Sequence, residues 1–230
     1  MRVCGLQKLS MVDFPGKIAA TVFTGGCDLR CPFCHNALLV TRLAESPALE
    51  EAEVFDFLTK RRGLLDGVVL SGGEPLLHPG AVDFLRRVRD LGYAVKLDTN
   101  GFHPAPLAEI LAEGLVDYVA MDIKNSPAKY AATCGLPALD LAPLEESIRL
   151  LRQSDVDYEF RTTLVKEFHT HDDLAAIGRW LGEVPHYYLQ HFVDSGCLIG
   201  GPFTPFDAPE TEELAAVLRP FARNVALRGL

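Results

Sequence analysis

Three cysteines near the start of the sequence are the residues best suited to chemistry. Cys27, Cys31 and Cys34 are separated by three and two residues, and thiolates are soft ligands that suit iron–sulfur clusters and zinc. Structural zinc takes four ligands, usually from two separated pairs, and the sequence has no second pair. His35 is a conceivable fourth ligand, but its adjacency to Cys34 would strain a shared site. A [4Fe–4S] cluster normally takes four cysteines, so three would leave one iron open to another ligand. We therefore expect a [4Fe–4S] cluster, with structural zinc and a redox thiol site as alternatives.

Two short segments combine glycine or turn residues with a carboxylate. In Ser71–Pro75, Gly72 and Gly73 permit positive φ and let backbone carbonyls approach a ligand near Glu74. In the second segment, Asp98 precedes Thr-Asn-Gly and could accept hydrogen bonds from a ribose hydroxyl or an ammonium. A strand-ending turn and a capped turn are the structural alternatives.

Charged residues also occur within apolar, strand-like runs. Asp122 and Lys124 alternate with apolar neighbours and therefore project to one face. Charges on an inward face are costly unless they bind a ligand or pair with each other. Arg161 could clamp a carboxylate through its planar guanidinium, and His191 is either a ligand-binding or a packing histidine.

The other cysteines and histidines show no ligand spacing. Cys4, Cys134 and Cys197 are scattered, and we expect them to be small buried apolar residues. His169 and His171 lie beside a predicted helix start and are expected at the surface.

Composition limits the partners and the compartment. The 230 residues include 31 acidic and 22 basic ones, and the net charge of -9 disfavours nucleic acid and anionic membranes as partners. No apolar run approaches the ~18–20 residues of a membrane span, and no basic-then-apolar signal opens the chain. Crowded cysteines in a reducing cytosol indicate metal ligation rather than disulfides. We expect a cytoplasmic protein.

The elements that would position these residues alternate between strands and helices. Strands are predicted at Ile18–Thr24, Gly67–Leu70, Ala94–Asp98, Tyr118–Ile123, Asp157–Leu164 and His186–Leu189. Helices are predicted at Glu50–Arg62, Pro79–Leu91, Pro106–Glu113, Leu144–Arg152, Asp172–Leu181 and Glu210–Phe221. Six β-then-α units imply parallel strands, and a full eight-unit barrel takes ~250 residues.

The fold class expected is therefore α/β, a partial (β/α)6 barrel with helices outside, with an opened doubly wound sheet as the alternative. We expect one domain over residues 1–230, made of an N-terminal extension (1–17), a β/α core (18–222) and a C-terminal tail (223–230). The polar clusters all follow the carboxyl ends of predicted strands, which is the edge where parallel α/β folds bind ligands.

The spacing CxxxCxxC, with Phe33 just before the third cysteine, resembles the radical S-adenosylmethionine (SAM) superfamily. The resemblance implies that SAM chelates the open iron of a [4Fe–4S] cluster. One electron then cleaves SAM to methionine and a 5′-deoxyadenosyl radical that abstracts hydrogen. The GGE stretch also matches this superfamily, and the DTNG and DxK stretches match its glycyl-radical activating enzymes, so the cofactor-binding residues implied are Phe33, Gly72, Gly73, Glu74, Asp98, Asp122 and Lys124. Arg161 and His191 are added as cofactor-binding candidates because they lie at the same edge, Arg161 on a predicted strand and His191 at the end of one. No side chain is assigned a catalytic role, because the cluster and SAM carry the chemistry.

Within that superfamily, the segment Gly5–Lys17 and the run Cys34-His35-Asn36 resemble the activating proteins of anaerobic (class III) ribonucleotide reductases. That resemblance implies an oxidoreductase that takes a hydrogen atom from a backbone glycine of a glycyl-radical partner. The electron donor implied is a flavodoxin or ferredoxin. Two alternatives are a radical SAM enzyme acting on a small molecule or peptide, and a non-catalytic metal-binding protein.

Overall fold

The computed structural model describes residues 1–194 and 196–229. Contacts divide the chain into two compact units. The first comprises Met1–Asp28, Leu38–Ala120 and Pro143–Asp157, and the second comprises Leu29–Ala37, Met121–Ala142 and Tyr158–Leu230. The expectation of a single domain stays a prediction, and the units are described one at a time.

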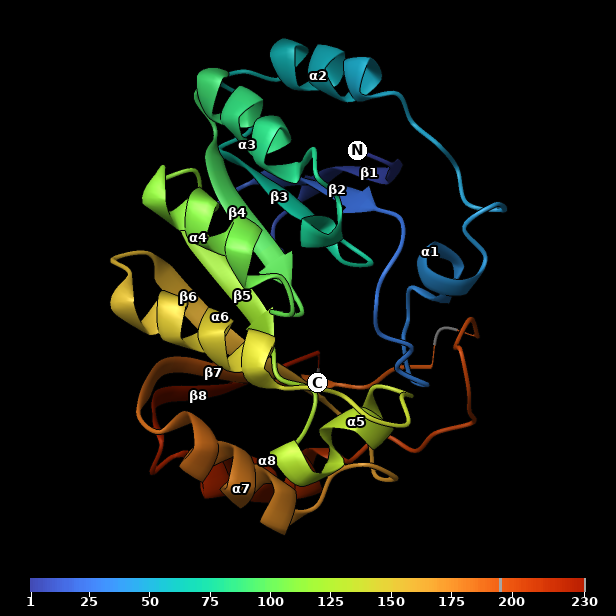
Figure 1. Cartoon of the computed structure of the whole chain (residues 1–230), viewed down its shortest axis with the longest axis vertical. Coiled ribbons are helices and arrows are strands. Elements are labelled where there is room, and N and C mark those ends of the chain that lie inside the picture. Colours follow the sequence, from blue (N-terminus) through green and yellow to red (C-terminus); the bar gives the residue numbers. More distant parts are fainter. Residues whose placement is uncertain (195, 230) are drawn as a thin grey trace. The chain divides into compact units, whose positions relative to one another are not determined.

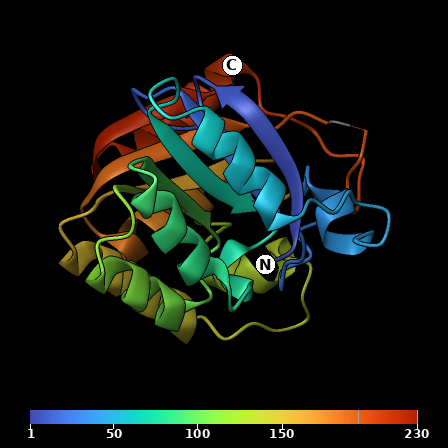
Figure 2. The ribbon, with the colours of Figure 1, turned by 90° about the horizontal axis from the view of Figure 1, so that it is seen from above.

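The strands of the first unit follow one another in chain order. They are β1 (Val3–Ser10), β2 (Ala19–Thr24), β3 (Gly67–Gly72) and β4 (Ala94–Thr99). β1 runs antiparallel to β2 and is the long dark-blue arrow in Figure 2. β2, β3 and β4 are parallel, because helical crossovers connect them. The start of β5 (Tyr118–Asp122) continues this order, since Asp117 N donates to Val95 O at 2.8 Å.

Helical segments connect the strands of the first unit (Figure 1). They are α1 (Ala37–Thr41), α2 (Glu51–Lys60), the 3-10 turn η1 (Pro75–Leu77), α3 (Ala81–Asp90), α4 (Pro104–Ala112) and α6 (Ala142–Gln153), of which α1 and α6 each begin with a residue of the second unit. In α3, Phe84, Leu85 and Val88 are buried and share one face, as a 3.6-residue period requires.

The second unit contains the end of β5 and the strands that follow it. These strands are β6 (Asp157–Leu164), β7 (Val184–His191) and β8 (Ala222–Arg228). The first residue of β6, Asp157, is the last residue of the first unit. β6, β7 and β8 are parallel, and Ile123 N donates to Arg161 O just beyond β5. The remaining elements are the 3-10 turn η2 (Pro127–Lys129), α5 (Tyr130–Thr133), α7 (His171–Leu181) and α8 (Ala208–Leu218). Figure 1 shows α7 and α8 lying together beside β7 and β8.

The predicted α/β class and parallel strands are confirmed. Two strands were missed: β1 lies within the expected N-terminal extension, and β8 occupies most of the expected tail, whose last residue Leu230 lies outside the described residues. β1 alternates poorly, with three exposed residues in succession, and β8 has little apolar periodicity because much of it is solvent-accessible. The short helices α1 and α5 fall below the length at which a helical period can be recognised.

Within the described part of the chain, no helix combines the length and the apolar character that crossing a bilayer requires.

Candidate functional site

The first cysteine of the motif lies in a network of polar side chains in the first unit. Asn100 Nδ2 donates to Asp28 Oδ1 at 2.8 Å and to Cys27 Sγ at 3.8 Å. On the other side of the carboxylate, His103 Nε2 lies 3.2 Å from Asp28 Oδ2. Hydrogen bonding to Asp28 raises the pKa of His103 in spite of burial. Burial raises the pKa of Asp28, but His103 and Asn100 outweigh burial and lower it overall.

Glu74 is fully buried next to this network. Its Oε1 accepts hydrogen bonds from Thr99 Oγ1 at 2.8 Å and from Leu76 N at 3.0 Å, while Oε2 accepts from Asn100 N at 2.6 Å. Burial raises the pKa of Glu74 to about 7, although these donors favour the ionised form. A carboxylate held only by neutral donors gains from a cationic ligand group, which would restore its full charge.

The two glycines before Glu74 allow the turn after β3 to pack against the turn after β2. Gly72 has φ +132°, and a Cβ there would lie 2.2 Å from Thr24 N. A Cβ at Gly73 would lie only 1.9 Å from Gly26 O, immediately before Cys27. Gly72 is therefore required where the ends of β2 and β3 pair, and Gly73 where the two turns meet, whether or not a ligand approaches them.

Asp98, at the end of β4, is held by its neighbours. Lys96 Nζ lies 2.5 Å from Asp98 Oδ1, and Ser71 Oγ donates to Asp98 Oδ2 at 3.1 Å. Lys96 is only 2% exposed, and sequence reasoning missed it. The signal that could have found it is spacing, because residues 96 and 98 share one face of a strand.

In the second unit, Asp122, Lys124 and Arg161 form one ion-pair group. Lys124 Nζ lies 2.9 Å from Asp122 Oδ2, and Arg161 Nε lies 2.8 Å from Asp122 Oδ1. Burial raises the pKa of Asp122, but Arg161 and Lys124 outweigh it and lower the pKa to about 2. Burial disfavours the Lys124 ammonium, yet Asp122 raises its pKa overall. The group carries two positive charges against one negative charge, which suits an anionic ligand group.

The other two motif cysteines lie in the second unit, where they meet a cysteine that sequence reasoning treated as isolated. Arg30 N donates to Cys134 O at 3.0 Å, and Cys34 N donates to Cys31 O at 3.0 Å. The Cys134 thiol hydrogen-bonds to Cys31 and lowers the pKa of Cys31 to about 7. Burial raises the pKa of Cys34. Cys134 is fully buried, as expected, and spacing along the chain gave no sign of its contact with Cys31.

Phe33 is buried against an aromatic pair, with ring centroids 5.5 Å from Phe168 and 6.5 Å from His169. The expectation that His169 lies at the surface was wrong, because it is 2% exposed and bonds to Lys124 O and to Val165 N. These bonds hold the backbone next to the ion-pair group. His171 is exposed, as predicted.

Three further expectations concern His191, Cys4 and Cys197. His191 ends β7 opposite Leu164 and is partly buried. Cys4 is buried as predicted, whereas Cys197 is only partly buried, so that prediction was wrong. Cys197 lies in a segment without helix or strand, where no element covers the side chain fully.

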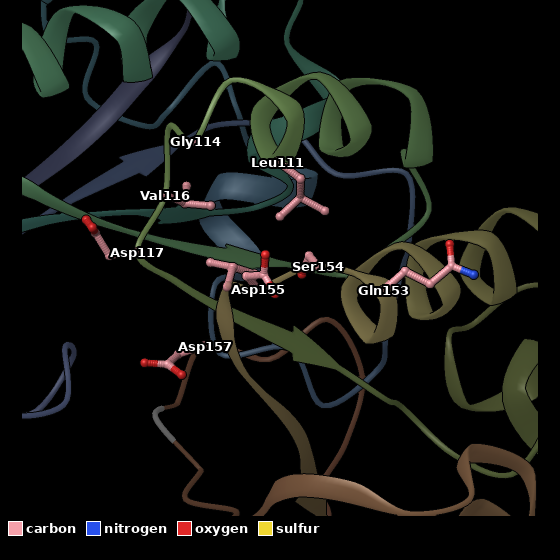
Figure 3. Close-up of a pocket in the computed structure, with 9 residues that line it drawn as sticks. Leu111, Gly114, Val116, Asp117, Gln153, Ser154, Asp155 and Asp157 are labelled. Atoms are coloured by element: carbon pink, nitrogen blue, oxygen red, sulfur yellow. The ribbon is translucent and has the colours of Figure 1, made fainter.

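An open depression of about 580 Å³ lies in the first unit, at the amino ends of β5 and β6. Figure 3 shows the residues that line it. The depression is lined by Leu111, Gly114, Val116, Asp117, Gln153, Ser154, Asp155, Val156 and Asp157. None of the residues predicted to bind a cofactor lines it. Because parallel α/β folds bind ligands at the carboxyl ends of strands, we place the candidate site with the polar clusters and not here.

Cys27, Cys31 and Cys34 take part in no disulfide bond. In the described residues, no three or more His, Cys, Asp or Glu side chains converge on a point that could hold a single metal ion. In a cubane cluster each cysteine binds a different iron, so its ligand atoms do not need to meet at one point.

Comparison with known proteins gives matches along most of the chain. Residues 21–181 match the model of the radical SAM superfamily. A protein of Methanocaldococcus jannaschii named a glycyl-radical enzyme activating enzyme is 31% identical over 236 residues, covering 99% of this chain and 96% of that protein. Pyruvate formate-lyase-activating enzyme of Clostridium pasteurianum is 34% identical over 129 residues, covering 54% of this chain and 52% of that enzyme.

The fold is similar to that of a solved structure that contains SAM. The crystal structure of Streptococcus suis SuiB bound to S-adenosylmethionine has a TM-score of 0.67 at 16% identity, and the match covers 91% of this chain. This chain spans about half of the SuiB chain, 52%. This likeness agrees with the open barrel that the sequence predicts.

Proposed function

We propose that this chain, which belongs to the radical SAM superfamily, installs a glycyl radical on an anaerobic ribonucleotide reductase. The observation that carries the proposal is the similarity over nearly its full length to a protein named a glycyl-radical enzyme activating enzyme. The resemblance of Gly5–Lys17 to the activating proteins of anaerobic reductases supports this particular partner. The whole-chain match favours a protein substrate over a small molecule.

The superfamily uses a [4Fe–4S] cluster and SAM, and the residues of this chain fit the cluster. Cys27, Cys31 and Cys34 lie within eight consecutive residues, and none of them is in a disulfide bond. Cys27 Sγ receives a hydrogen bond from Asn100, and Cys31 receives one from Cys134, as suits thiolates bound to iron. We assign the cluster to these three cysteines. When bound, it supplies the electron that cleaves the sulfonium of SAM.

Several polar groups of this chain suit different parts of SAM. Glu74, held by neutral donors, would take the ammonium, with Gly72 and Gly73 keeping its turn in place. Asp98, oriented by Lys96 and Ser71, would accept from a ribose hydroxyl. The ion-pair group of Asp122, Lys124 and Arg161 has the charge to receive the carboxylate of the methionine moiety. The further SAM-binding residues that we propose are Phe33 and His191.

The remaining parts of the proposal concern the setting of the reaction. Transfer of an electron to SAM makes the protein an oxidoreductase, and a flavodoxin or ferredoxin would supply that electron. Since both cluster and glycyl radical need a reducing environment, we propose a cytoplasmic location. Activation of pyruvate formate-lyase is a second candidate, favoured by the match to the Clostridium pasteurianum enzyme.

The test is to mix anaerobically cluster-loaded protein with SAM, a reductant and the cognate reductase. A glycine-centred doublet in the electron paramagnetic resonance spectrum is expected, together with release of 5′-deoxyadenosine. The Cys31→Ala variant should lose bound iron and SAM cleavage, whereas Cys4→Ala, at a buried cysteine outside the motif, should keep both.

Three results would contradict the proposal. A doublet with pyruvate formate-lyase in place of the reductase would change the partner. SAM cleavage without a radical on either protein would favour the small-molecule or peptide alternative. Tetrahedral zinc in anaerobically purified protein would remove the radical mechanism altogether.

A further inference from the structure

We infer that Asn100 is a positioning residue for the iron–sulfur cluster, which raises its reduction potential by donating an N–H bond to the sulfur of Cys27. The inference rests on the cluster assignment of the proposed function and on three contacts of one side chain. Asn100 Nδ2 lies 3.8 Å from Cys27 Sγ and 2.8 Å from Asp28 Oδ1. Its two amide hydrogens therefore have one acceptor each.

The orientation of the amide is fixed by the turn that contains it. Asn100 Oδ1 accepts a hydrogen bond from Phe102 N at 3.0 Å, so the oxygen cannot exchange places with the nitrogen without losing this bond. The main-chain N of Asn100 donates to Glu74 Oε2 at 2.6 Å, which anchors the backbone. The side chain is 5% exposed, so water competes little for its donors. The N–H groups are thus held toward Cys27 and Asp28.

Two electrostatic effects make this contact important for reduction. Hydrogen bonds to the cysteine sulfurs of an iron–sulfur cluster favour the more negative, reduced state and raise the potential. Asp28 has the opposite influence, since its Oδ1 lies 3.8 Å from Cys27 Sγ. Asn100 engages that same oxygen and so opposes the carboxylate, while His103 lies against the other oxygen. Without Asn100, the sulfur would lose a donor and face the carboxylate directly.

The experiment compares the midpoint potentials of the reconstituted cluster in the absence of SAM. Each potential is measured in a redox titration that is monitored by electron paramagnetic resonance. Asn100→Ala should hold iron as the wild type does and show a more negative midpoint. Asn100→Asp keeps the acceptor for Phe102 N but replaces the donor with a charge, so its midpoint should be lower still. Asn224→Ala, at an exposed asparagine that contacts His186 in the second unit, should leave the midpoint unchanged.

A measurement on the wild type keeps the inference testable if both variants lose the cluster. Protein labelled with ¹⁵N in the asparagine side-chain amide should show a nitrogen coupling to the reduced cluster in pulsed electron paramagnetic resonance. An unchanged midpoint in iron-loaded Asn100→Ala, or absence of that coupling, would overturn the inference. Wild-type protein that carries the cluster but activates no partner would refute only the proposed function.

Discussion

Glu74 is a buried carboxylate whose three hydrogen-bond partners all donate. A glutamine at this position would direct its NH2 group toward a donor and leave buried groups unsatisfied. We expect Glu74→Gln to lower the free energy of unfolding by about 1–3 kcal/mol and to weaken SAM binding. Urea unfolding measures the first effect. Glu53→Gln, at an exposed position of α2, should change stability by less than about 0.5 kcal/mol, and an equally small loss for Glu74→Gln would contradict the structure.

Asp122 should contribute a pH-dependent part of the stability. Its pKa falls from 3.8 in the unfolded chain to about 2 in the fold, where Arg161 and Lys124 outweigh burial. A carboxyl group whose pKa is lowered by folding stabilises the fold at pH values above its unfolded pKa. Asp122 should therefore contribute about 2 kcal/mol to the free energy of unfolding above pH ~4, and this contribution is lost as the pH falls toward 2. Asp122→Asn should therefore be less stable than the wild type at neutral pH, and the difference should shrink below pH ~4. Urea unfolding across this range measures it.

The matched control for that series is Asp56→Asn, an exposed aspartate of α2. The free energy of unfolding of Asp56→Asn should stay within about 0.5 kcal/mol of the wild-type value at every pH. A difference for Asp122→Asn that does not change with pH would show that Arg161 and Lys124 do not hold the carboxylate in solution.

At the scale of elements, the turn after β3 is positioned by its contact with the turn after β2. Because a Cβ at Gly73 would lie 1.9 Å from Gly26 O, Gly73→Ala must separate the two turns. We expect a loss of about 1–3 kcal/mol in unfolding free energy and a lower iron content after reconstitution, since Gly26 directly precedes Cys27. Chemical denaturation and iron analysis measure these effects.

Gly63→Ala is the comparison, because Gly63, unlike Gly73, has a positive φ of +75°, and a Cβ there would meet no atom within 4 Å. It should lose stability through backbone strain alone and keep its iron. If Gly73→Ala behaved in the same way, packing between the turns would not be needed for the cysteine loop.

At the scale of the whole molecule, the residues proposed to bind SAM extend along the chain from Phe33 to His191. Such a ligand binds the folded state and not the unfolded chain, and at 100 times its dissociation constant it stabilises the fold by about 2.7 kcal/mol. For a chain of this size that corresponds to a rise in melting temperature of roughly 5–10 °C. Anaerobic scanning fluorimetry of cluster-loaded protein tests this. An equal rise in the cluster-free Cys31→Ala variant would argue against chelation of SAM by the cluster.

The strands and helices that carry the site could be predicted well because each repeats a local pattern. Gly67–Leu70 and Asp157–Leu164 are apolar, strand-like runs, and the structure has strands at both. β1 and β8 could not be predicted in this way, since they are partly exposed and lack a clear apolar period. The burial of His169 was missed because it depends on a contact with Lys124, 45 positions earlier in the chain, which no local pattern connects to it.

The cysteine motif, the carboxylates and cations that follow the strands, and the superfamily to which these point could all be recognised without a structure. Motif spacing and strand periodicity are short-range properties, so they can be seen without coordinates. Only the tertiary structure decided that Lys96 lies buried against Asp98, that Cys134 contacts Cys31, and that Asn100 donates to Cys27. The partners in the last two contacts are more than 70 positions apart, so no short-range pattern connects them and only the folded chain brings them together.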